Sequence, residues 1–285
     1  MSATRSTKAA EAQPSLAELR REIDRIDEAM HRLLMERGEI IATLIRVKRS
    51  DESGSAFRPG READQMRRLA ARHGGILPLD TAESILRVII GTFTYVQKAY
   101  AVHADISGGD APMRDSARFH FGFTVPYLTH ASASEVIDAV AASAGDLGMF
   151  RSDQGAQAGA WWQSLAASGA PKIIARLPFI ERPRHPAGTP VYVIAKPLAE
   201  AAARERLLFA VGVERWRASI PVAIAALGSA VIASAASERG LNLLVESPGE
   251  ITSARIANAL EADGLSITGI AEVGSHAERF TVVSS

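Results

Sequence analysis

Two basic side chains share one side of a long predicted helix. Arg37 and Lys48 lie eleven residues apart within residues 15–49, where apolar residues recur at alternating gaps of three and four. Eleven residues make about three helical turns, so both side chains point to nearly the same side. Arg37 also falls on the apolar stripe, where an unpaired buried charge is costly. We therefore expect Arg37 to meet an anion.

Four further polar residues could complete an anion-binding pocket. Arg20 precedes Lys48 by 28 residues, about 42 Å along a straight helix, so only an antiparallel partner helix could bring a second Arg20 to that pocket. Arg61 and Glu62 open a second predicted helix, and Gln97 lies on a third. Collected in space, these groups suit a small dianion. The alternative is that they are solvated surface charges or helix-spaced ion pairs, as most such residues are.

Composition narrows the classes of function. The 285 residues contain 32 Lys and Arg against 32 Asp and Glu, so no overall charge favours nucleic acid or a membrane surface. The absence of cysteine excludes thiol catalysis and disulfides, and the seven histidines are scattered, so we expect neither a metal nor a cofactor. No signal peptide is recognised, and the apolar run 220–236 is interrupted by a proline and a glycine. We expect a cytoplasmic protein.

The pattern predicts several domains, an all-α three-helix domain followed by α/β and α+β regions. Ser15 and Glu18, and again Asp80 and Glu83, predict capping boxes at the first and third helices. The expected organisation is a disordered tail at 1–14, helices at 15–49, 61–73 and 80–103 in a domain spanning 15–104, a linker at 105–116, an α/β region at 117–197 and a small α+β domain at 204–285.

The second half alternates between predicted strands and helices. Strands are expected at 119–125, 147–150, 172–177, 191–195, 207–213, 241–246, 266–273 and 280–283, with helices at 134–144, 222–237 and 251–263. The order expected after residue 204 is not βαββαβ. Trp161 and Trp162 are expected to be core or interface anchors.

The first third resembles a known enzyme family. The segment LAELRREIDRIDEAMHRLLMERGEIIATLIRVKR, a loop ending in PGRE and then VIIGTFTYVQKAY are similar to the all-helical chorismate mutases, over about residues 15–104. The resemblance implies an intertwined helical homodimer that isomerises chorismate to prephenate. It also assigns roles by motif position: carboxylate binding by Arg37 and by the partner protomer's Arg20, contact with the ether oxygen by Lys48 and Gln97, support of the anionic end by Arg61, and contact with the ring hydroxyl by Glu62.

Two positions depart from that family's pattern. Phe93 stands four residues before Gln97, where the family usually has a small hydroxyl residue, and Arg58 stands where an acidic residue often precedes Arg61. Both are candidate pocket-lining residues that could narrow the pocket, lower the rate or alter the substrate. Plain core packing of Phe93 is an equal alternative.

The second half is similar to part of a prephenate dehydratase. The resemblance rests on FHFGFTVPYLTHASASEVIDAVAASAGDLGMFRSDQGAQAGAWW followed by TPVYVIAKP. Thr189 is followed by Pro190 and Val191, so the Arg and Phe of that family's catalytic Thr-Arg-Phe segment are missing. We interpret 117–197 as a reduced, catalytically silent relative; the alternative is an unrelated α/β module. Residues 204–285 occupy the position of a regulatory amino-acid-binding domain in that family.

The function expected from the sequence is therefore that of a chorismate mutase acting in aromatic amino-acid biosynthesis. The alternative is a weakened mutase-like dimer that serves as a binding or regulatory protein, with Phe93 blocking the pocket. A bifunctional mutase and dehydratase is disfavoured by Pro190 and Val191.

Overall fold

The computed structural model describes residues 13–47, 55–154, 159–196, 203–237 and 240–282. Its contacts divide the chain into two compact units, Met1–Ser50 and Asp51–Ser285. An all-α segment is followed by a mixed α/β region, as the sequence predicts. No helix in the described ranges is long and apolar enough to cross a membrane.

Within the first unit, the described residues form one long helix, α1 (Leu16–Val47). The predicted capping box is present: the Ser15 backbone N–H donates to Glu18 Oε2 over 2.8 Å, and the Glu18 N–H donates to Ser15 Oγ over 3.2 Å. None of the helix's residues is buried. Most of its apolar stripe is exposed, including Leu19, Ile23, Ile26, Met30, Leu33 and Ile40.

Two more helices open the second unit, α2 (Pro59–Arg72) and α3 (Leu79–Gln97). Pro59 occupies the first helical turn, where its missing N–H costs nothing. The prediction that the third helix continues to residue 103 is wrong. Strand β1 (Val102–Asp105) follows instead, buried along its whole length between two parallel neighbours, and its burial on both faces overrides the helical pattern.

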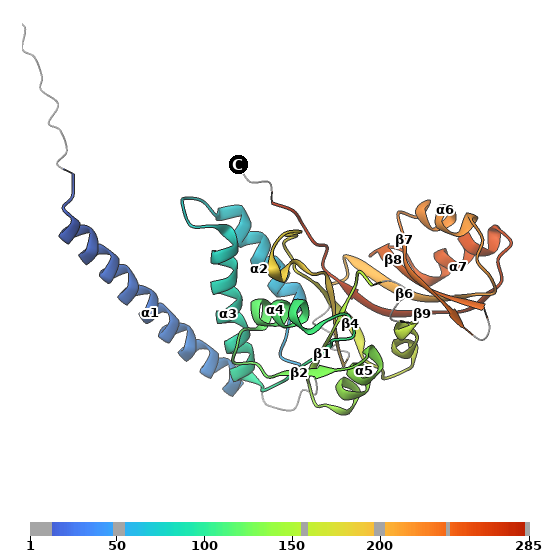
Figure 1. Cartoon of the computed structure of the whole chain (residues 1–285), viewed down its shortest axis with the longest axis horizontal. Coiled ribbons are helices and arrows are strands. Elements are labelled where there is room, and N and C mark those ends of the chain that lie inside the picture. The colour runs from blue at the N-terminus through green and yellow to red at the C-terminus, as the bar shows by residue number, and fades with distance from the viewer. Residues whose placement is uncertain (1–12, 48–54, 155–158, 197–202, 238–239, 283–285) are drawn as a thin grey trace, which may run out of the picture. The chain divides into compact units, whose positions relative to one another are not determined.

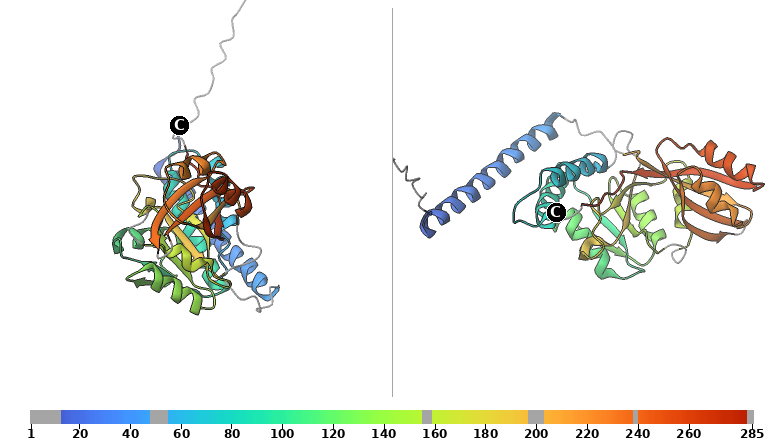
Figure 2. Two further views of the ribbon diagram at one scale, coloured as in Figure 1. Left: turned by 90° about the vertical axis from the view of Figure 1, so that its right-hand side faces the viewer. Right: turned by 90° about the horizontal axis from the view of Figure 1, so that it is seen from above.

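A nine-stranded sheet runs through the second unit in the order β2-β1-β3-β5-β4-β9-β6-β8-β7 (Figures 1 and 2). Its first five strands are β1, β2 (Tyr127–His130), β3 (Leu147–Arg151), β4 (Lys172–Leu177) and β5 (Val191–Ala195). One face of these strands shares a core with α2, α3 and α4 (Asp110–Phe121). The opposite face packs on α5 (Ala133–Ala142) and the short helix η2 (Trp161–Ala166), where Trp161 and Trp162 are core residues as expected.

Helix α4 (Asp110–Phe121) corrects two predictions. Residues 105–116 are not a linker and residues 119–125 are not a strand. Met113, Ala117 and Phe121, at helical spacing, fill the core beneath the sheet. Gly122 ends the helix with a φ of 75°, a conformation that other residues rarely adopt.

The last part of the chain has the βαββαβ order, contrary to our expectation. It comprises β6 (Arg206–Val213), α6 (Ser219–Ala225), β7 (Ala230–Ser237), β8 (Gly240–Pro248), α7 (Ser253–Ala262) and β9 (Ile267–His276). The predicted helix 222–237 is wrong beyond Ala225, because Gly228 turns the chain and β7 pairs antiparallel with β8. Of the strand predicted at 280–283, Phe280 forms an isolated bridge with Ile180, and residue 283 lies outside the described ranges.

The approach of α3 to α4 can be tested at Gly91. A Cβ there would lie 2.7 Å from the Phe121 carbonyl oxygen. We expect Gly91→Ala to lower the free energy of unfolding by about 1–2 kcal/mol, because overpacking outweighs the gain in helix propensity. Gly74→Ala, with nothing within 4 Å of its Cβ, should change it by less than about 0.5 kcal/mol. Denaturant unfolding measures both; equal stabilities would contradict the close approach.

Candidate functional site

The predicted site residues of the first unit lie on α1. Arg20 is exposed and Arg37 is half-buried, seventeen residues apart on the same helix. Lys48 lies outside the described residues. The gathering of these three side chains with those of the second unit stays a prediction.

In the second unit, Glu62 is buried at the start of α2 and Arg61 beside it is exposed. Glu62 is 4% exposed, and its Oε2 accepts a hydrogen bond of 2.6 Å from Arg87 Nη1. Arg87 is fully buried on α3, and its Nη2 donates over 2.9 Å to the carbonyl oxygen of His120 on α4. Arg87 therefore joins α2, α3 and α4 through charge-assisted hydrogen bonds.

A second buried ion pair lies one turn earlier on α3. Glu83 is 0% exposed, and Arg182 Nη2 lies 2.5 Å from Glu83 Oε2. The expected capping box of Asp80 and Glu83 is wrong: α3 begins at Leu79 after Pro78, and Glu83 faces the interior. Glu83 and Arg87 are buried charged residues that were not predicted from the sequence, and neither was the partly buried Arg182 that pairs with Glu83. The sequence feature that could have indicated them is the pair Glu83 and Arg87, opposite charges spaced i,i+4 on a largely apolar helix.

Burial dominates the electrostatics of this cluster. It raises the pKa of Glu62, and the charge and hydrogen bond of Arg87 offset part of that rise. Burial likewise raises the pKa of Glu83, with Arg182 opposing it. Burial and the nearby Arg87 hold the pKa of His120 well below its usual range, so the ring is neutral. The Tyr100 hydroxyl also stays neutral, because burial and Glu62 raise its pKa.

The remaining predicted residues use their donors locally. Gln97 Nε2 donates to the backbone carbonyl of Phe93 over 3.0 Å, and both side chains are half-buried. Arg58 Nη1 donates to the Ser55 carbonyl over 2.6 Å and braces the turn that enters α2. Of the predicted residues in this unit, the structure brings Glu62 against α3, and it places Gln97 beside Phe93.

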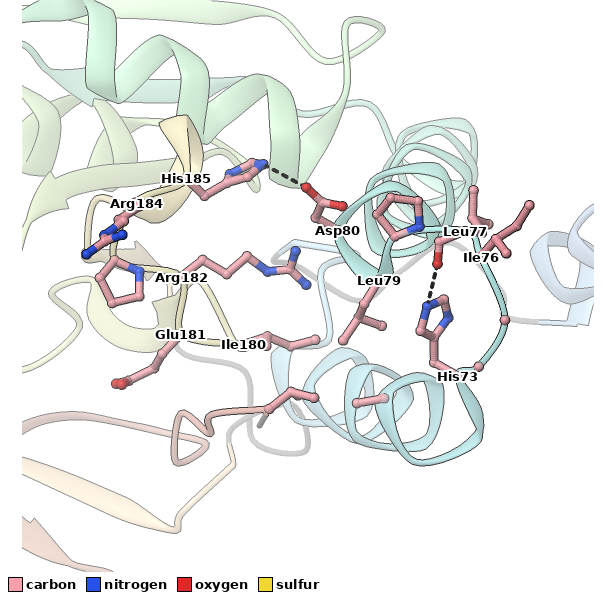
Figure 3. Close-up of a pocket in the computed structure, with 16 residues that line it drawn as sticks. His73, Ile76, Leu77, Leu79, Asp80, Ile180, Glu181, Arg182, Arg184 and His185 are labelled. Atoms are coloured by element: carbon pink, nitrogen blue, oxygen red, sulfur yellow. Dashed lines mark hydrogen bonds and ion pairs between the residues drawn. The ribbon is translucent and has the colours of Figure 1, made fainter. Parts of the chain in front are cut away.

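A cavity of about 990 Å³ lies elsewhere in the second unit, between the α2–α3 connection and the segment after β4 (Figure 3). Arg182, Arg184, Asp80 and His185 contribute its polar lining, with 4.0 Å between the His185 ring and Asp80. Ile180 and Leu79 belong to its apolar lining. Arg61, Glu62 and Gln97, the predicted site residues that the structure describes in this unit, are not among its lining residues. Among the described residues, no three His, Asp or Glu side chains are grouped to hold a metal ion.

Comparison with known proteins supports the resemblance in the first third of the chain. Residues 19–98 match the family model described as chorismate mutase type II. Similar solved structures include prephenate dehydratase from Arthrobacter aurescens in complex with L-Phe (12% identity, 63% of this chain and 90% of that chain, TM-score 0.43). Prephenate dehydratase from Streptococcus mutans is another (12% identity, 64% and 99%, TM-score 0.39). Comparison with curated protein sequences gave no match.

The Glu83–Arg182 pair predicts a pH-dependent loss of stability. We expect Arg182→Gln to lower the free energy of unfolding by about 3 kcal/mol near pH 7, because it leaves a buried carboxylate without its closest cation. The loss should shrink as the pH falls through the raised pKa of Glu83, since protonation removes the buried charge. Denaturant unfolding at several pH values measures this.

The matched control is Arg68→Gln, which breaks an exposed ion pair with Asp64. It should cost less than about 0.5 kcal/mol at every pH. A loss in Arg182→Gln that is equally small, or that does not depend on pH, would contradict the ion pair.

Proposed function

We propose that the protein is a chorismate mutase that isomerises chorismate to prephenate. The single observation that carries the proposal is the family match at residues 19–98, which contains all six residues assigned to the site: Arg20, Arg37, Lys48, Arg61, Glu62 and Gln97. The match covers the first third of the chain, and the activity is proposed for that part.

The proposed reaction needs groups that bind and orient more than groups that react. In a concerted rearrangement one C–O bond breaks while one C–C bond forms, with no nucleophile and no net proton transfer. An enzyme can help by holding the compact reactive conformer and by placing hydrogen-bond donors where charge develops on the departing oxygen. Arg20 and Arg37 hold the carboxylates, and Lys48 and Gln97 meet the ether oxygen. Arg61 supports the anionic end, and Glu62 accepts from the ring hydroxyl.

The proposed active form is a homodimer. Helix α1 spans 32 residues, about 48 Å, and most of its apolar stripe is exposed. A stripe of this kind is typical of helices that pack along a partner helix. In an antiparallel pair, each α1 carries its Arg20 to the pocket that contains the other chain's Arg37.

One observation favours the alternative, a mutase-like dimer that binds without rapid turnover. The Gln97 amide nitrogen already donates a hydrogen bond to the Phe93 carbonyl, one helical turn earlier on α3. The amide must give up this hydrogen bond before it can donate to the ether oxygen of the substrate, which would slow turnover without preventing binding.

Chorismate turnover tests the proposal directly. We expect the purified full-length protein to convert chorismate to prephenate. The reaction is measured as a loss of chorismate absorbance. Arg37→Ala should lower kcat/KM by at least about a hundredfold, the scale of losing one preorganised electrostatic group. Circular dichroism and size-exclusion chromatography should show unchanged helicity and dimer size.

No turnover at saturating chorismate would overturn the proposal. Calorimetric binding of a dianionic analogue without turnover, tightened by Phe93→Ser, would support the alternative. If Arg37→Ala dissociates the dimer, the arginine is structural.

The shared site predicts complementation between two inactive variants. Arg20→Ala and Arg37→Ala should each be inactive alone, because each removes a group from both sites of the dimer. After the chains are mixed and exchanged, half of the sites in each heterodimer regain both arginines, so activity should recover to about a quarter of the wild-type value.

The control is a mixture in which one chain carries both substitutions and the other carries Arg37→Ala, and it should stay inactive. Failure of the first mixture, with heterodimer formation verified by mass spectrometry, would show that Arg20 does not act across the dimer.

A further inference from the structure

We propose that Arg87 is the positioning residue for Glu62 and keeps its carboxylate oriented and ionised for the substrate hydroxyl. This inference rests on the proposed function and deepens it. Arg87 belongs to none of the motif positions assigned to the site.

Geometry is the first support. Arg87 Nη1 donates to Glu62 Oε2 over 2.6 Å while Nη2 donates to the His120 carbonyl over 2.9 Å. Because the guanidinium is a rigid planar fork, two bonds made in different directions fix its orientation and therefore that of the carboxylate. Both side chains are shielded from water, with exposures of 0% for Arg87 and 4% for Glu62.

The charges around Glu62 give the second support. Arg61, its neighbour on α2, is exposed and contributes less than Arg87 to the electrostatics of Glu62. Tyr100, after α3, and His120, on α4, both stay neutral. Arg87 is thus the main positive charge that opposes the effect of burial on Glu62.

The other charges near Arg87 belong to the neighbouring ion pair. Glu83 feels the charge of Arg87 but lies closest to Arg182, which follows β4. Arg182 therefore balances Glu83, and Arg87 balances Glu62. Through the His120 carbonyl, which holds Arg87, a residue beyond the matched segment 19–98 helps to position the partner of a site residue within it.

The positive charge of Arg87 favours the ionised form of the Glu62 carboxylate. An ionised carboxylate only accepts hydrogen bonds, which is the role proposed for Glu62 toward a hydroxyl. Loss of the Arg87 charge raises the pKa of Glu62 further, so the carboxylate protonates at a higher pH. As the pH is lowered, kcat/KM should fall when Glu62 protonates, and we call this fall the acid limb. Without the Arg87 charge the acid limb should move to higher pH, an effect that altered packing alone does not produce.

The experiment compares Arg87→Gln and Arg87→Lys in the full-length chain with chorismate as substrate. Arg87→Gln retains an amide donor but no charge. Its acid limb should move up by about one pH unit, lowering kcat/KM about tenfold at pH values below the limb. Arg87→Lys retains the charge but loses the fork, so its limb should stay at the wild-type pH while KM rises. A limb in Arg87→Gln that coincides with the wild type overturns the inference.

Arg182→Gln is the matched control, because it removes a neighbouring, partly buried cation that pairs with Glu83. It should lower stability and leave the acid limb in place; an equal shift would show a general effect of lost charge and overturn the inference. Absence of turnover in the wild type would instead overturn the proposed function.

If Arg87→Gln does not fold, two other variants test the inference. Glu62→Gln should abolish the acid limb of kcat/KM, and Arg87→Lys should raise KM. A persistent limb in Glu62→Gln, or a wild-type KM in Arg87→Lys, overturns the inference.

Discussion

The buried guanidinium of Arg87 constrains the structure around it. An unpaired charge in a protein interior is strongly destabilising, so this side chain can be buried only where a carboxylate and a backbone acceptor are both supplied. Glu62 on α2 supplies the first, and the His120 carbonyl on α4 supplies the second. Three helices must therefore be in place together before any one of them can bury its share of this cluster.

The compact units of the chain do not divide where its composition changes. Composition suggested a boundary at 105–116, but α2, α3, α4 and the sheet share one core that includes Met66, Ile90, Met113 and Val193. The contacts instead separate α1, in Met1–Ser50, from the rest of the chain. Helices α2 and α3, which belong to the matched mutase segment, thus fold as part of the α/β region that follows them.

The sequence predicted elements whose pattern is local. The Ser15 capping box, the first two helices and strands β3, β4 and β5 follow from periodicity and turn residues. Predictions from the sequence were wrong where residues distant in the chain determine the structure. The alanine-rich strand β7 has a helical composition but pairs with β8, and the partners of Arg87 lie 25 and 33 residues away. Similarly, His103 Nδ1 and His130 Nε2 lie 2.8 Å apart only because β1 and β2 are parallel neighbours.

The same distinction applies to the candidate site. A motif identifies the groups that could bind a dianion, and five of its six residues carry charge. Whether a buried carboxylate among them is ionised depends on tertiary neighbours that the motif does not contain. For Glu62 that neighbour is Arg87, which is held in turn by the backbone of α4. If the helices catalyse the proposed rearrangement, the region after residue 98 is therefore part of the catalytic unit, because it helps to fix the charge on a group that the substrate must meet.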